Sequence, residues 1–546
     1  MASSLSKSPH CFLLLSLIFI ISIQFANSLN NNNEMILPPK LEFKSLCKTT
    51  PYPNDCLNTL KLTISLNLPL TLLNFLLQSL QNALSEATKL SSLFDATTNY
   101  NLIEKQRGSL LDCKELHHIS HLSLQKSVSK VKASNLTDAR VFLSAALSNK
   151  ETCLEGLASA SGPWKPLLVS FIANTYNHVS NSLSMLSSDS PQPLSPSSWS
   201  LNSKILGDND YDDGNNGGDD DGGAGYEDDL SETIIVAADG SGNFTSVQEG
   251  VDFAPNNSEF RTFIYVRKGV YEENVEIPSY KPNIVLLGDG SDVTMITGNR
   301  SVADGWTTFR SATVAVSGEG FLARDITIAN TAGPEKAQAA ALRINADLTA
   351  VYRCNILGYQ DTLYVHSFRQ FYRECNIYGT IDYIFGNAAV VLQGCTIVSR
   401  MPLPGQYTVI TAQSRVMPSE NTGIVLQNCT VLATQELNGN KSRVRSYLGR
   451  PWRPYARTVY IESYIDEFID PKGWIKWSSN DFDDMQNSLY YGEFGNRGPG
   501  SITDGRVNWG GYHVMDYYDA SNFTVHEFIV GEQWLDSTSF PYDEGI

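Results

Sequence analysis

The sequence predicts a two-domain protein, with an N-terminal all-α helical bundle and a C-terminal all-β parallel β-helix. Residues 40–188 are Leu/Ser/Ala-rich and show helical periodicity. Residues 189–232 change abruptly to a Ser/Pro-rich and then an Asp/Gly-rich composition. Residues 233–546 contain short β-rich segments that repeat about every 20 residues. A chain of 546 residues is also too long for one ordinary domain.

Residues 1–28 predict a secretory signal peptide. Lys7 precedes an apolar run over residues 11–25, and Ala26-Asn27-Ser28 supplies the small residues of a cleavage site after Ser28. The apolar run is shorter than the roughly 20 residues that a membrane span needs, so an uncleaved anchor is the less favoured alternative. We therefore expect a secreted, extracellular protein in which disulfides can form.

The region over residues 40–188 predicts several long helices with short connections. Leu76, Leu80 and Leu84 recur at helical spacing, and residues 141–157 show the same period with Asp138 as the expected N-cap. Such helices typically pack as an antiparallel bundle. The pattern alone indicates no chemistry.

Residues 189–232 predict a flexible linker. Residues 208–232 hold 11 acidic residues and no basic one, so the segment repels itself and cannot bury much apolar surface. Binding of Ca²⁺ or mimicry of a polyanion is the less favoured interpretation. The net charge of −18 for the whole chain opposes nucleic acid or an anionic membrane as partner.

The C-terminal repeat is clearest in a Cys-x-Ile/Val word that occurs at Cys354, Cys375, Cys395 and Cys429. The intervals are 21, 20 and 34 residues, which indicates stacked coils with one inserted loop. Equivalent positions of adjacent coils lie about 4.8 Å apart, so a Cys375–Cys395 disulfide is a tentative expectation. A Cys395–Cys429 bridge is the main alternative, and unpaired thiols also remain open.

Two carboxyl groups are the strongest candidates for chemistry. Asp361 and Asp382 are 21 residues apart, which is one coil, so the stack should place them side by side. Two close carboxylates cannot both ionise freely, and the higher pKa then suits a proton donor while the other group serves as nucleophile. A structural hydrogen-bonding role is the alternative. The region lacks the Gly-x-Ser-x-Gly and His-Glu-x-x-His words, so a His-dependent hydrolase is not favoured.

Five short sequence motifs occur in the order found in the plant pectin methylesterase (pectinesterase) family, and through them about residues 233–540 resemble that family. They are Gly269-Val-Tyr-Glu-Glu273, Gln338-Ala-Ala-Ala-Leu342, Gln360-Asp-Thr-Leu363, Asp382-Tyr-Ile-Phe-Gly386 and Leu448-Gly-Arg-Pro-Trp452. The resemblance implies a carboxylic ester hydrolase that removes methyl esters from the galacturonate residues of pectin and releases methanol. It also implies cell wall modification and a cell wall location.

The same resemblance implies roles for the residues of these words. Asp382 is the nucleophile that attacks the ester carbonyl, and Asp361 is the proton donor that then acts as a base on water. Gln360 stabilises the transition state, and Gln338 contacts the oxyanion and the substrate. Coil-stacking amides are the alternative interpretation of the two glutamines.

Three further residues are implied to bind or position the substrate. Arg450 holds Asp382 ionised and oriented, Trp452 offers a flat apolar face to a pyranose ring, and Thr308 contacts the substrate. The alternatives are a structural salt bridge, a core tryptophan and a turn hydroxyl. We expect no metal and no organic cofactor, because the ester is already electrophilic.

The cysteine spacings of the N-terminal region resemble those of the plant invertase/pectin methylesterase inhibitor family. Cys47 and Cys56 are 9 residues apart, and Cys113 and Cys153 are 40 apart. The resemblance implies a disulfide-stapled four-helix bundle with Cys47–Cys56 and Cys113–Cys153 bridges. The full expectation is therefore an all-α four-helix bundle followed by an all-β right-handed parallel β-helix.

The bundle is implied to be a pro-region that masks the catalytic cleft or assists folding and export. The dibasic cleavage word common in this family is missing, because Lys204 is the only basic residue between Asn174 and Ile234. Removal of the bundle is therefore not expected at such a word. Expected partners are methyl-esterified homogalacturonan, the bundle itself as an intramolecular inhibitor, and separate inhibitor proteins.

Two other functions remain as alternatives: another pectin-active β-helix enzyme, a lyase or a polygalacturonase, or an inactive pectin-binding protein. Residues 233–546 hold 24 basic and 35 acidic residues, a net charge of −11. This charge favours highly methylated pectin over the de-esterified product, unless Arg and Lys line the groove locally.

Among the Asn-x-Ser/Thr sequons, Asn428 lies in an apolar run and is expected to be buried. The glycosylation candidates are Asn135, Asn243, Asn256, Asn299, Asn440 and Asn522.

Overall fold

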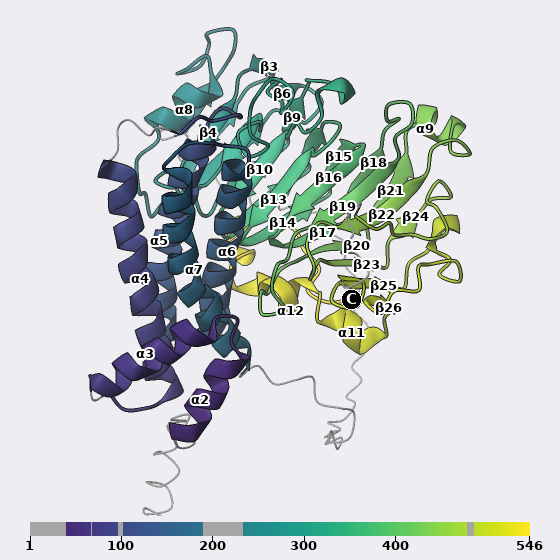
Figure 1. Cartoon of the computed structure of the whole chain (residues 1–546). Coiled ribbons are helices and arrows are strands. Elements are labelled where there is room, and N and C mark those ends of the chain that lie inside the picture. The colour runs from purple at the N-terminus through teal and green to yellow at the C-terminus, as the bar shows by residue number, and fades with distance from the viewer. Residues whose placement is uncertain (1–39, 67, 97–101, 189–232, 478–484) are drawn as a thin grey trace, which may run out of the picture.

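The computed structural model describes residues 40–66, 68–96, 102–188, 233–477 and 485–546. The predicted signal peptide and the predicted linker lie outside the described residues. The chain forms a helical part, residues 40–188, and a catalytic part, residues 233–546, whose strands are stacked beside the helices (Figure 1).

Four long helices form the bundle of the helical part, preceded by a short helical hairpin (Figure 1). The described helices are α2 (Lys40–Thr49), α3 (Pro53–Ser65), α4 (Leu72–Ala96), α5 (Ser109–Lys132), α6 (Leu136–Ala158) and α7 (Lys165–Ser188). The periodic leucines face inward, and Leu80, Leu124 and Leu143 are fully buried. The prediction of an all-α N-terminal part is confirmed.

Two disulfides staple these helices. Cys47–Cys56 joins α2 to α3, and Cys113–Cys153 joins α5 to α6, as the resemblance implied. The N-cap of α6 is Asn135, whose side-chain oxygen accepts a hydrogen bond from the Asp138 backbone N–H at 3.0 Å. The expected Asp138 cap is therefore wrong, since the helix begins three residues earlier.

The catalytic part is a parallel β-helix made of three sheets, and every strand pair described is parallel. The first sheet, in spatial order, contains β1 (Ile234–Val236), β2 (Thr262–Val266), β5 (Ile284–Gly288), β8 (Leu322–Arg324), β11 (Thr349–Tyr352), β14 (Arg369–Arg373), β17 (Ala389–Gln393), β20 (Gly423–Gln427), β23 (Arg457–Ile461), β25 (Tyr490–Phe494) and β26 (Tyr512–Val514). The second contains β22 (Ser446–Pro451), β19 (Thr408–Gln413), β16 (Ile381–Gly386), β13 (Leu363–Ser367), β10 (Leu342–Asn345), β7 (Val314–Val316) and β4 (Val275–Ile277). The third contains β24 (Tyr464–Ile465), β21 (Thr430–Ala433), β18 (Thr396–Ser399), β15 (Asn376–Gly379), β12 (Asn355–Leu357), β9 (Thr327–Asn330), β6 (Thr294–Gly298) and β3 (Gly269–Glu272).

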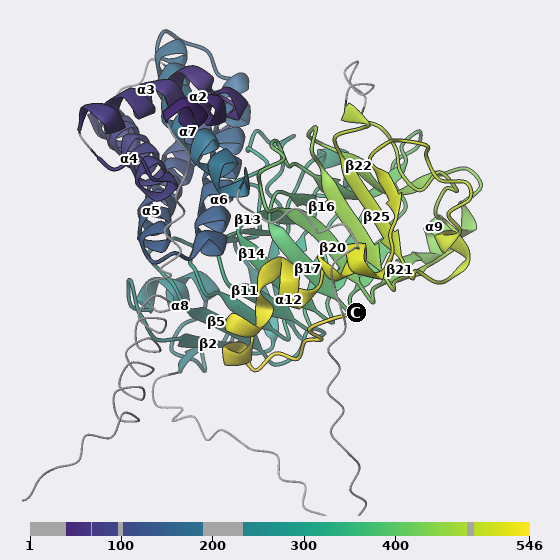
Figure 2. The same cartoon turned by 90° about the horizontal axis from the view of Figure 1, so that it is seen from below.

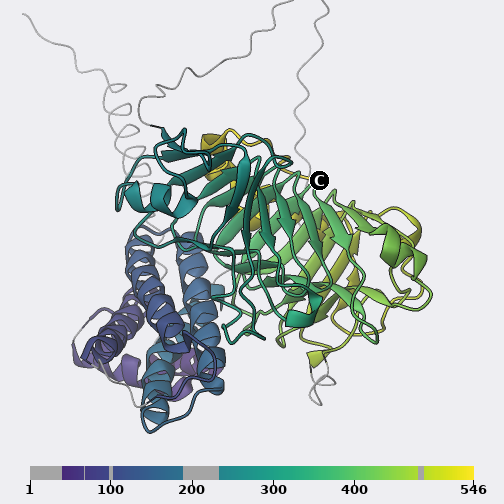
Figure 3. The same cartoon turned by 90° about the horizontal axis from the view of Figure 1, so that it is seen from above.

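The register of the third sheet explains the repeated Cys-x-Ile/Val word. Ile356 pairs with Ile377, which pairs with Ile397, which pairs with Val431, and all four side chains are buried inside the coil. Figure 3 shows the coils stacked side by side along the body. The prediction of a parallel β-helix is confirmed, because the word marks the same position in successive coils.

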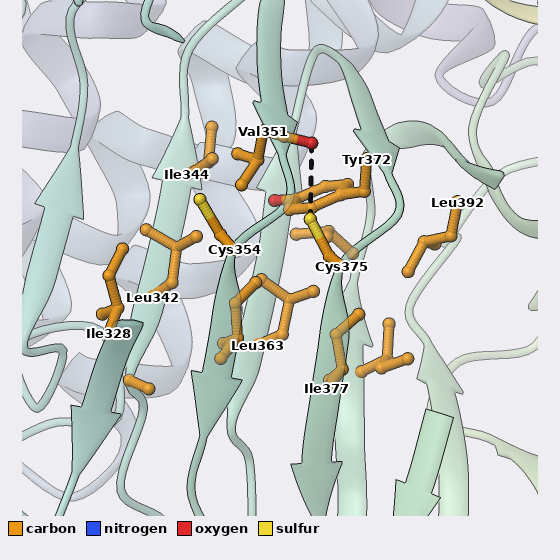
Figure 4. Close-up of a cluster of buried hydrophobic side chains, with 14 of the residues drawn as sticks. Ile328, Leu342, Ile344, Val351, Cys354, Leu363, Tyr372, Cys375, Ile377 and Leu392 are labelled. Carbon is orange, nitrogen blue, oxygen red and sulfur yellow. Dashed lines mark hydrogen bonds between the residues drawn. The ribbon is translucent and has the colours of Figure 1, made fainter. Parts of the chain in front are cut away.

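The predicted Cys375–Cys395 disulfide is wrong, because the structure has these cysteines as free thiols, together with Cys354 and Cys429. The Cys375 thiol donates to the carbonyl oxygen of Val351 at 3.4 Å (Figure 4). Cys395 donates in the same way to Tyr372 at 3.5 Å. Cys375, Cys395 and Cys429 therefore each donate to a backbone carbonyl of the preceding coil, whereas Cys354 donates to the Tyr352 carbonyl of its own coil.

Asn428 is exposed, contrary to expectation. It occupies the turn between β20 and β21 with a φ of 49°, a conformation that asparagine tolerates better than most residues. The six glycosylation candidates divide by exposure. Asn243, Asn256, Asn299 and Asn522 are exposed, and Asn135 and Asn440 are half-buried.

Short elements complete the fold. They are α8 (Val247–Phe253), α9 (Gln435–Gly439), α11 (Tyr517–Ser521), α12 (Val525–Ile529) and the 3₁₀ turns η2 (Pro334–Lys336), η3 (Pro499–Ser501), η4 (Gly531–Gln533) and η5 (Asp536–Thr538). The C-terminal segment with α12 packs on the outer face of the first sheet (Figure 2). Among the described residues, no helix combines the length and apolar character that a membrane span requires.

Candidate active site

The site lies on the outer face of the second sheet, where Asp361 and Asp382 occupy equivalent positions of successive coils. Leu363 pairs with Ile384, so the register places Asp361 beside Asp382, and the Asp361 N–H donates to the Ile381 carbonyl at 3.0 Å. Both aspartates have positive φ, 63° and 51°, which Asp adopts more readily than most residues. The structure thus brings the predicted carboxyl pair together.

Arg450 reaches this pair from β22, two strands away in the second sheet. Its Nε donates to Asp382 Oδ1 at 2.8 Å and its Nη2 to Asp382 Oδ2 at 2.5 Å. Its Nη1 donates to the Tyr407 hydroxyl at 3.0 Å, and the guanidinium lies 4.1 Å from the ring centroid of Trp477. Such a two-point contact holds both the charge and the orientation of the Asp382 carboxylate.

Burial raises the pKa of both carboxyl groups, because the charged form is poorly solvated there. The Asp361 pKa rises well above its ordinary value, and the negative charge of Asp382 adds to that rise. The Arg450 guanidinium opposes the effect, and of the two aspartates it donates hydrogen bonds only to Asp382. Of the two carboxyl groups, Asp382 is therefore the one whose charged form the arginine stabilises by hydrogen bonds.

Gln338, Gln360 and Thr308 lie around the same cavity, which has a volume of about 220 Å³. Gln338 follows Ala337, whose φ of 58° and ψ of −139° belong to a region that residues other than glycine rarely enter. The backbone N–H of Ala339 donates to the Gln360 carbonyl at 3.1 Å, so the two glutamine segments lie on adjacent coils. Both amide side chains line the cavity that the Asp361 and Asp382 carboxyls line.

An aromatic wall borders the carboxyl pair. Tyr364 and Phe385 stack with ring centroids 4.2 Å apart, and Trp452 lies 6.0 Å from Phe385. Tyr364 and Phe385 were not predicted as site residues, although each follows a catalytic candidate by three positions. This equal spacing from the two aspartates in successive coils is the sequence signal from which both aromatic residues could have been predicted. Tyr407 and Trp477 were missed because no repeat connects them to the carboxyl pair.

The helical part supplies the remaining wall of the cavity. Gln106, Asp112, Thr152, Glu155 and Gly156 line it together with the residues of the second sheet. The Thr307 hydroxyl donates to Asp112 at 2.6 Å, and Arg310 pairs with Asp112 at 2.5 Å. Arg453 pairs with Glu155 on the side of Trp452. Nothing in the sequence indicated these contacts, because they join segments about 200 to 300 residues apart.

His366 is a structural residue and does not line the cavity. Its side chain is 1% exposed, and Nε2 lies 2.8 Å from the Thr152 hydroxyl of α6. Burial lowers the pKa of this histidine well below its ordinary value, so it stays neutral. In the described part of the chain, no three His, Cys, Asp or Glu side chains form a cluster suited to a metal ion.

The geometry defines a class of enzyme. A carboxylate held by arginine, a neighbouring carboxyl group with a raised pKa and two amide side chains suit nucleophilic attack on an ester carbonyl. The open, aromatic-lined face of a parallel β-helix suits a polysaccharide. The chain therefore has the features of a polysaccharide-directed carboxylic ester hydrolase.

Comparison with known proteins identifies the family. The pectinesterase family matches residues 233–532, and the plant invertase/pectin methylesterase inhibitor family matches residues 42–185. The chain is 58% identical to the "Probable pectinesterase/pectinesterase inhibitor 12" of Arabidopsis thaliana over all of both chains. It is 42% identical to "Pectinesterase 2" of Citrus sinensis, over 92% of this chain and 95% of that one.

A solved structure agrees with this result. The pectin methylesterase from carrot is 51% identical, with a TM-score of 0.57, and matches 58% of this chain and 99% of its own. The chain belongs to the pectinesterase family and is a pectin methylesterase with an N-terminal inhibitor-like domain. Its substrate is pectin.

Proposed function

We propose that the catalytic part hydrolyses galacturonate methyl esters of homogalacturonan with Asp382 as the nucleophile. The observation that carries this proposal is the two-point contact of Arg450 with Asp382, at 2.8 and 2.5 Å. The contact keeps the buried carboxylate ionised and aims it into the cavity. The carboxylate attacks the ester carbonyl carbon, whose oxygen takes up the negative charge.

Gln338 and Gln360 are proposed as donors to that oxygen. Both line the cavity beside Asp382, and an amide N–H aimed at a developing oxyanion stabilises the transition state more than the ground state. In this proposal, they replace the backbone oxyanion hole of many serine hydrolases.

Asp361 is proposed to protonate the departing methanol. The carbon–oxygen bond to the methoxy group breaks, the Asp361 proton passes to the methoxy oxygen, and an acyl-enzyme on Asp382 remains. A water molecule then attacks the acyl carbon and gives one proton to Asp361. The bond between the acyl carbon and Asp382 breaks, the second water proton passes to solvent as galacturonate leaves as a carboxylate, and both aspartates return to their starting states. The raised pKa of Asp361 supports the first half of this cycle.

Trp452 and Thr308 are proposed to bind the polysaccharide. Trp452 lies beside the stacked rings of Tyr364 and Phe385, and these apolar faces suit pyranose rings and the ester methyl group. Thr308 lines the same cavity, together with Gln338. Arg450 takes part by positioning Asp382.

The test of the catalytic assignment is methanol release from highly methylated pectin. We expect the separate catalytic part to be active and Asp382→Asn to lower kcat by about 10³-fold or more. Asp292→Asn, a change at an exposed carboxyl that does not line the cavity, should leave kcat unchanged. Retained activity of Asp382→Asn would exclude it as nucleophile. Folded protein that releases no methanol but cleaves the polymer would support a lyase or polygalacturonase.

The helical part is proposed to be an intramolecular inhibitor. Asp112, Thr152 and Glu155 stand in the cavity where a pectin chain would lie. Further contacts hold the two parts together: Arg369 pairs with Asp138 at 2.9 Å, and Asn387 donates to Ser148 at 2.8 Å. A separate inhibitor protein of the same family would need the same surface, so it should bind only after the helical part has left.

Methanol release by the full chain tests this second role. We expect the full chain to be much less active than the catalytic part, and purified helical part to inhibit the catalytic part when it is added back. Equal activity of the two forms would leave the helical part with the folding or export role instead.

Secretion to the cell wall is also proposed. The two disulfides of the helical part and the pectin substrate both support an extracellular site. Mass spectrometry of the secreted protein would show whether it begins after Ser28.

A further inference from the structure

A second cavity lies beside the active-site cavity, on the loops that follow β6 and β9, two strands near the top of Figure 1. Its volume is about 310 Å³, and it is lined by Asn299, Arg300, Asp304, Trp306, Thr331 and Lys336, among others. Trp306 directly precedes Thr307 and Thr308 of the active-site cavity, and Lys336 lies two residues before Gln338. The two cavities are therefore neighbours along the surface that carries the substrate.

The chemistry of this second cavity differs from that of the active site. The active-site cavity presents neutral amides and aromatic rings for an uncharged ester. The second cavity has two cations, Arg300 and Lys336, beside the half-buried ring of Trp306. The Arg300 guanidinium lies over that ring at 4.4 Å from its centroid. An indole beside two cations suits a sugar ring that carries a carboxylate.

Neither cation is strongly committed to an internal partner. Arg300 is 3.7 Å from Glu276, too far for a hydrogen bond, and its side chain keeps 28% of its surface exposed. Lys336 pairs with Asp304 at 2.6 Å, but its side chain is 45% exposed and Asp304 also accepts a hydrogen bond from Ser301. Exposed pairs of this kind are weak and exchange readily for another anion.

We propose that this second cavity binds the free carboxylate of a de-esterified galacturonate residue while another residue of the same pectin chain lies at Asp382. The net charge of −11 on the catalytic part predicts weak retention of de-esterified pectin, and local cations overcome that repulsion. The inference rests on pectin being the substrate, and it does not depend on which aspartate is the nucleophile.

The helical part contacts the loop that carries Trp306 of this cavity. The Arg107 backbone N–H donates to the Gly305 carbonyl at 2.6 Å, and the Arg107 guanidinium lies 5.7 Å from the Trp306 centroid. The binding test therefore uses the catalytic part alone. The carrot enzyme is matched over 99% of its chain by 58% of this one, so a chain of about this extent has a solved structure of its own.

The first experiment measures binding of fully de-esterified trigalacturonate by calorimetry. This ligand has no ester, so binding is separated from catalysis. Asn299 begins the sequon Asn-Arg-Ser and lines the same cavity, so all proteins carry Asn299→Gln to keep a glycan out. We expect Arg300→Gln and Lys336→Gln each to weaken binding about three- to tenfold, and added salt to weaken it further. Arg324→Gln, the same change on the first sheet, is the matched control and should have no effect.

Asp304→Asn should change the affinity for trigalacturonate in the opposite direction. The Asp304 carboxylate competes with the ligand for Lys336, and its pKa is lowered by the hydrogen bond from Lys336, so it is charged at neutral pH. Removing that charge should tighten trigalacturonate binding at least about twofold. A structural defect would not tighten binding, so this variant separates recognition from damage to the fold.

The second experiment compares KM and kcat on fully methylated and on half-methylated pectin. Arg300→Gln and Lys336→Gln should raise KM on the half-methylated polymer only, with kcat unchanged on both. Unchanged trigalacturonate binding in all three variants, or an equal rise of KM on both polymers, would overturn the inference. If the parent protein releases no methanol, the proposed catalytic function fails, whereas the binding result still decides the second cavity.

Discussion

The behaviour of Asp361 and Asp382 follows from one asymmetry between two similar residues. Both aspartates sit at the same position of successive coils, both are almost fully buried and both have left-handed backbone angles. Only Asp382 receives the guanidinium hydrogen bonds of Arg450. The difference between the two carboxyl groups is therefore imposed by Arg450 of β22, which lies 68 residues further along the chain than Asp382.

Replacement of Arg450 should move the acid limb of the pH–rate profile. Arg450 lowers the pKa of Asp382, and the nucleophile must be ionised, so activity is lost as pH falls through that pKa. Arg450→Gln removes this effect, and the acid limb of kcat/KM should move to higher pH. Arg450→Lys keeps a point charge without the two-point contact and should move it less. An unmoved acid limb in Arg450→Gln would mean that another group sets it.

Gln360 offers a test of oxyanion stabilisation. Gln360→Ala should lower kcat about 10²- to 10³-fold with little change in KM, because the lost hydrogen bond forms mainly in the transition state. Gln533→Ala, an exposed glutamine of η4, serves as the control and should behave as the parent enzyme. A fall in kcat of less than about threefold in Gln360→Ala would show that the amide has a stacking role instead.

At the scale of elements, the β-helix places the site by register. One coil of β13, β14 and β15 runs parallel to the next coil of β16, β17 and β18, so any side chain repeats its position after one turn. That regularity let the 21-residue spacing of Asp361 and Asp382 predict contact. The helical part has no such repeat, and the position of α6 over the cavity follows from packing between the two parts.

Helix α6 carries several contacts with the catalytic part, so its N-cap is a test of the helical element. Asn135→Ala should lower the free energy of unfolding of the helical part by about 1 kcal/mol, because a helix N–H loses its acceptor. Thr137→Ala removes the same Asn-Leu-Thr sequon without touching the cap and should change stability by less than about 0.5 kcal/mol. Denaturation followed by circular dichroism compares the two, and equal losses would point to the glycan.

At the scale of the whole molecule, the interface between the helical part and the catalytic part contains carboxyl groups with raised pKa values. Asp112 is 2% exposed, between Thr307 and Arg310 of the catalytic part. Burial raises the pKa of Asp112 to about 7, against the lowering effect of Arg310. Glu155 also has a pKa raised to about 7, but its side chain is 37% exposed, so Asp112 carries most of the argument.

The closed arrangement should therefore depend on pH. Separation of the two parts exposes Asp112 and returns its pKa toward the ordinary value of 3.8, so the closed form binds the proton more tightly. Closure is then favoured as pH falls from about 7 toward 4 and weakens as pH rises through that range. The activity of the full chain relative to the catalytic part should be lower at pH 5 than at pH 8.

Asp112→Asn provides the check on this pH dependence. The amide stays uncharged at every pH, so the ratio of the two activities should vary less between pH 5 and pH 8 than in the parent chain. An unchanged pH dependence in Asp112→Asn would assign the effect to other groups at the interface, such as Glu155.

The sequence by itself determined the two fold classes and the stacked carboxyl pair, whereas the two stapling disulfides were implied by the family resemblance. The fold classes and the carboxyl pair rest on a local or strictly repeated signal: helical periodicity and a coil length of about 20 residues. The sequence-based predictions of Asp138 as a helix N-cap and of a Cys375–Cys395 disulfide were wrong. The first residue of a helix and the partner of a thiol depend on the atoms that the folded structure places beside them.

Only the tertiary structure decided which residues surround the carboxyl pair. Tyr407 and Trp477 reach Arg450 from loops outside the repeat, and Asp112 comes from the other part of the chain. The second cavity likewise combines two loops, with Arg300 on one and Lys336 on the other. Such contacts join residues far apart in the chain, and their geometry follows from how whole elements pack rather than from any local pattern.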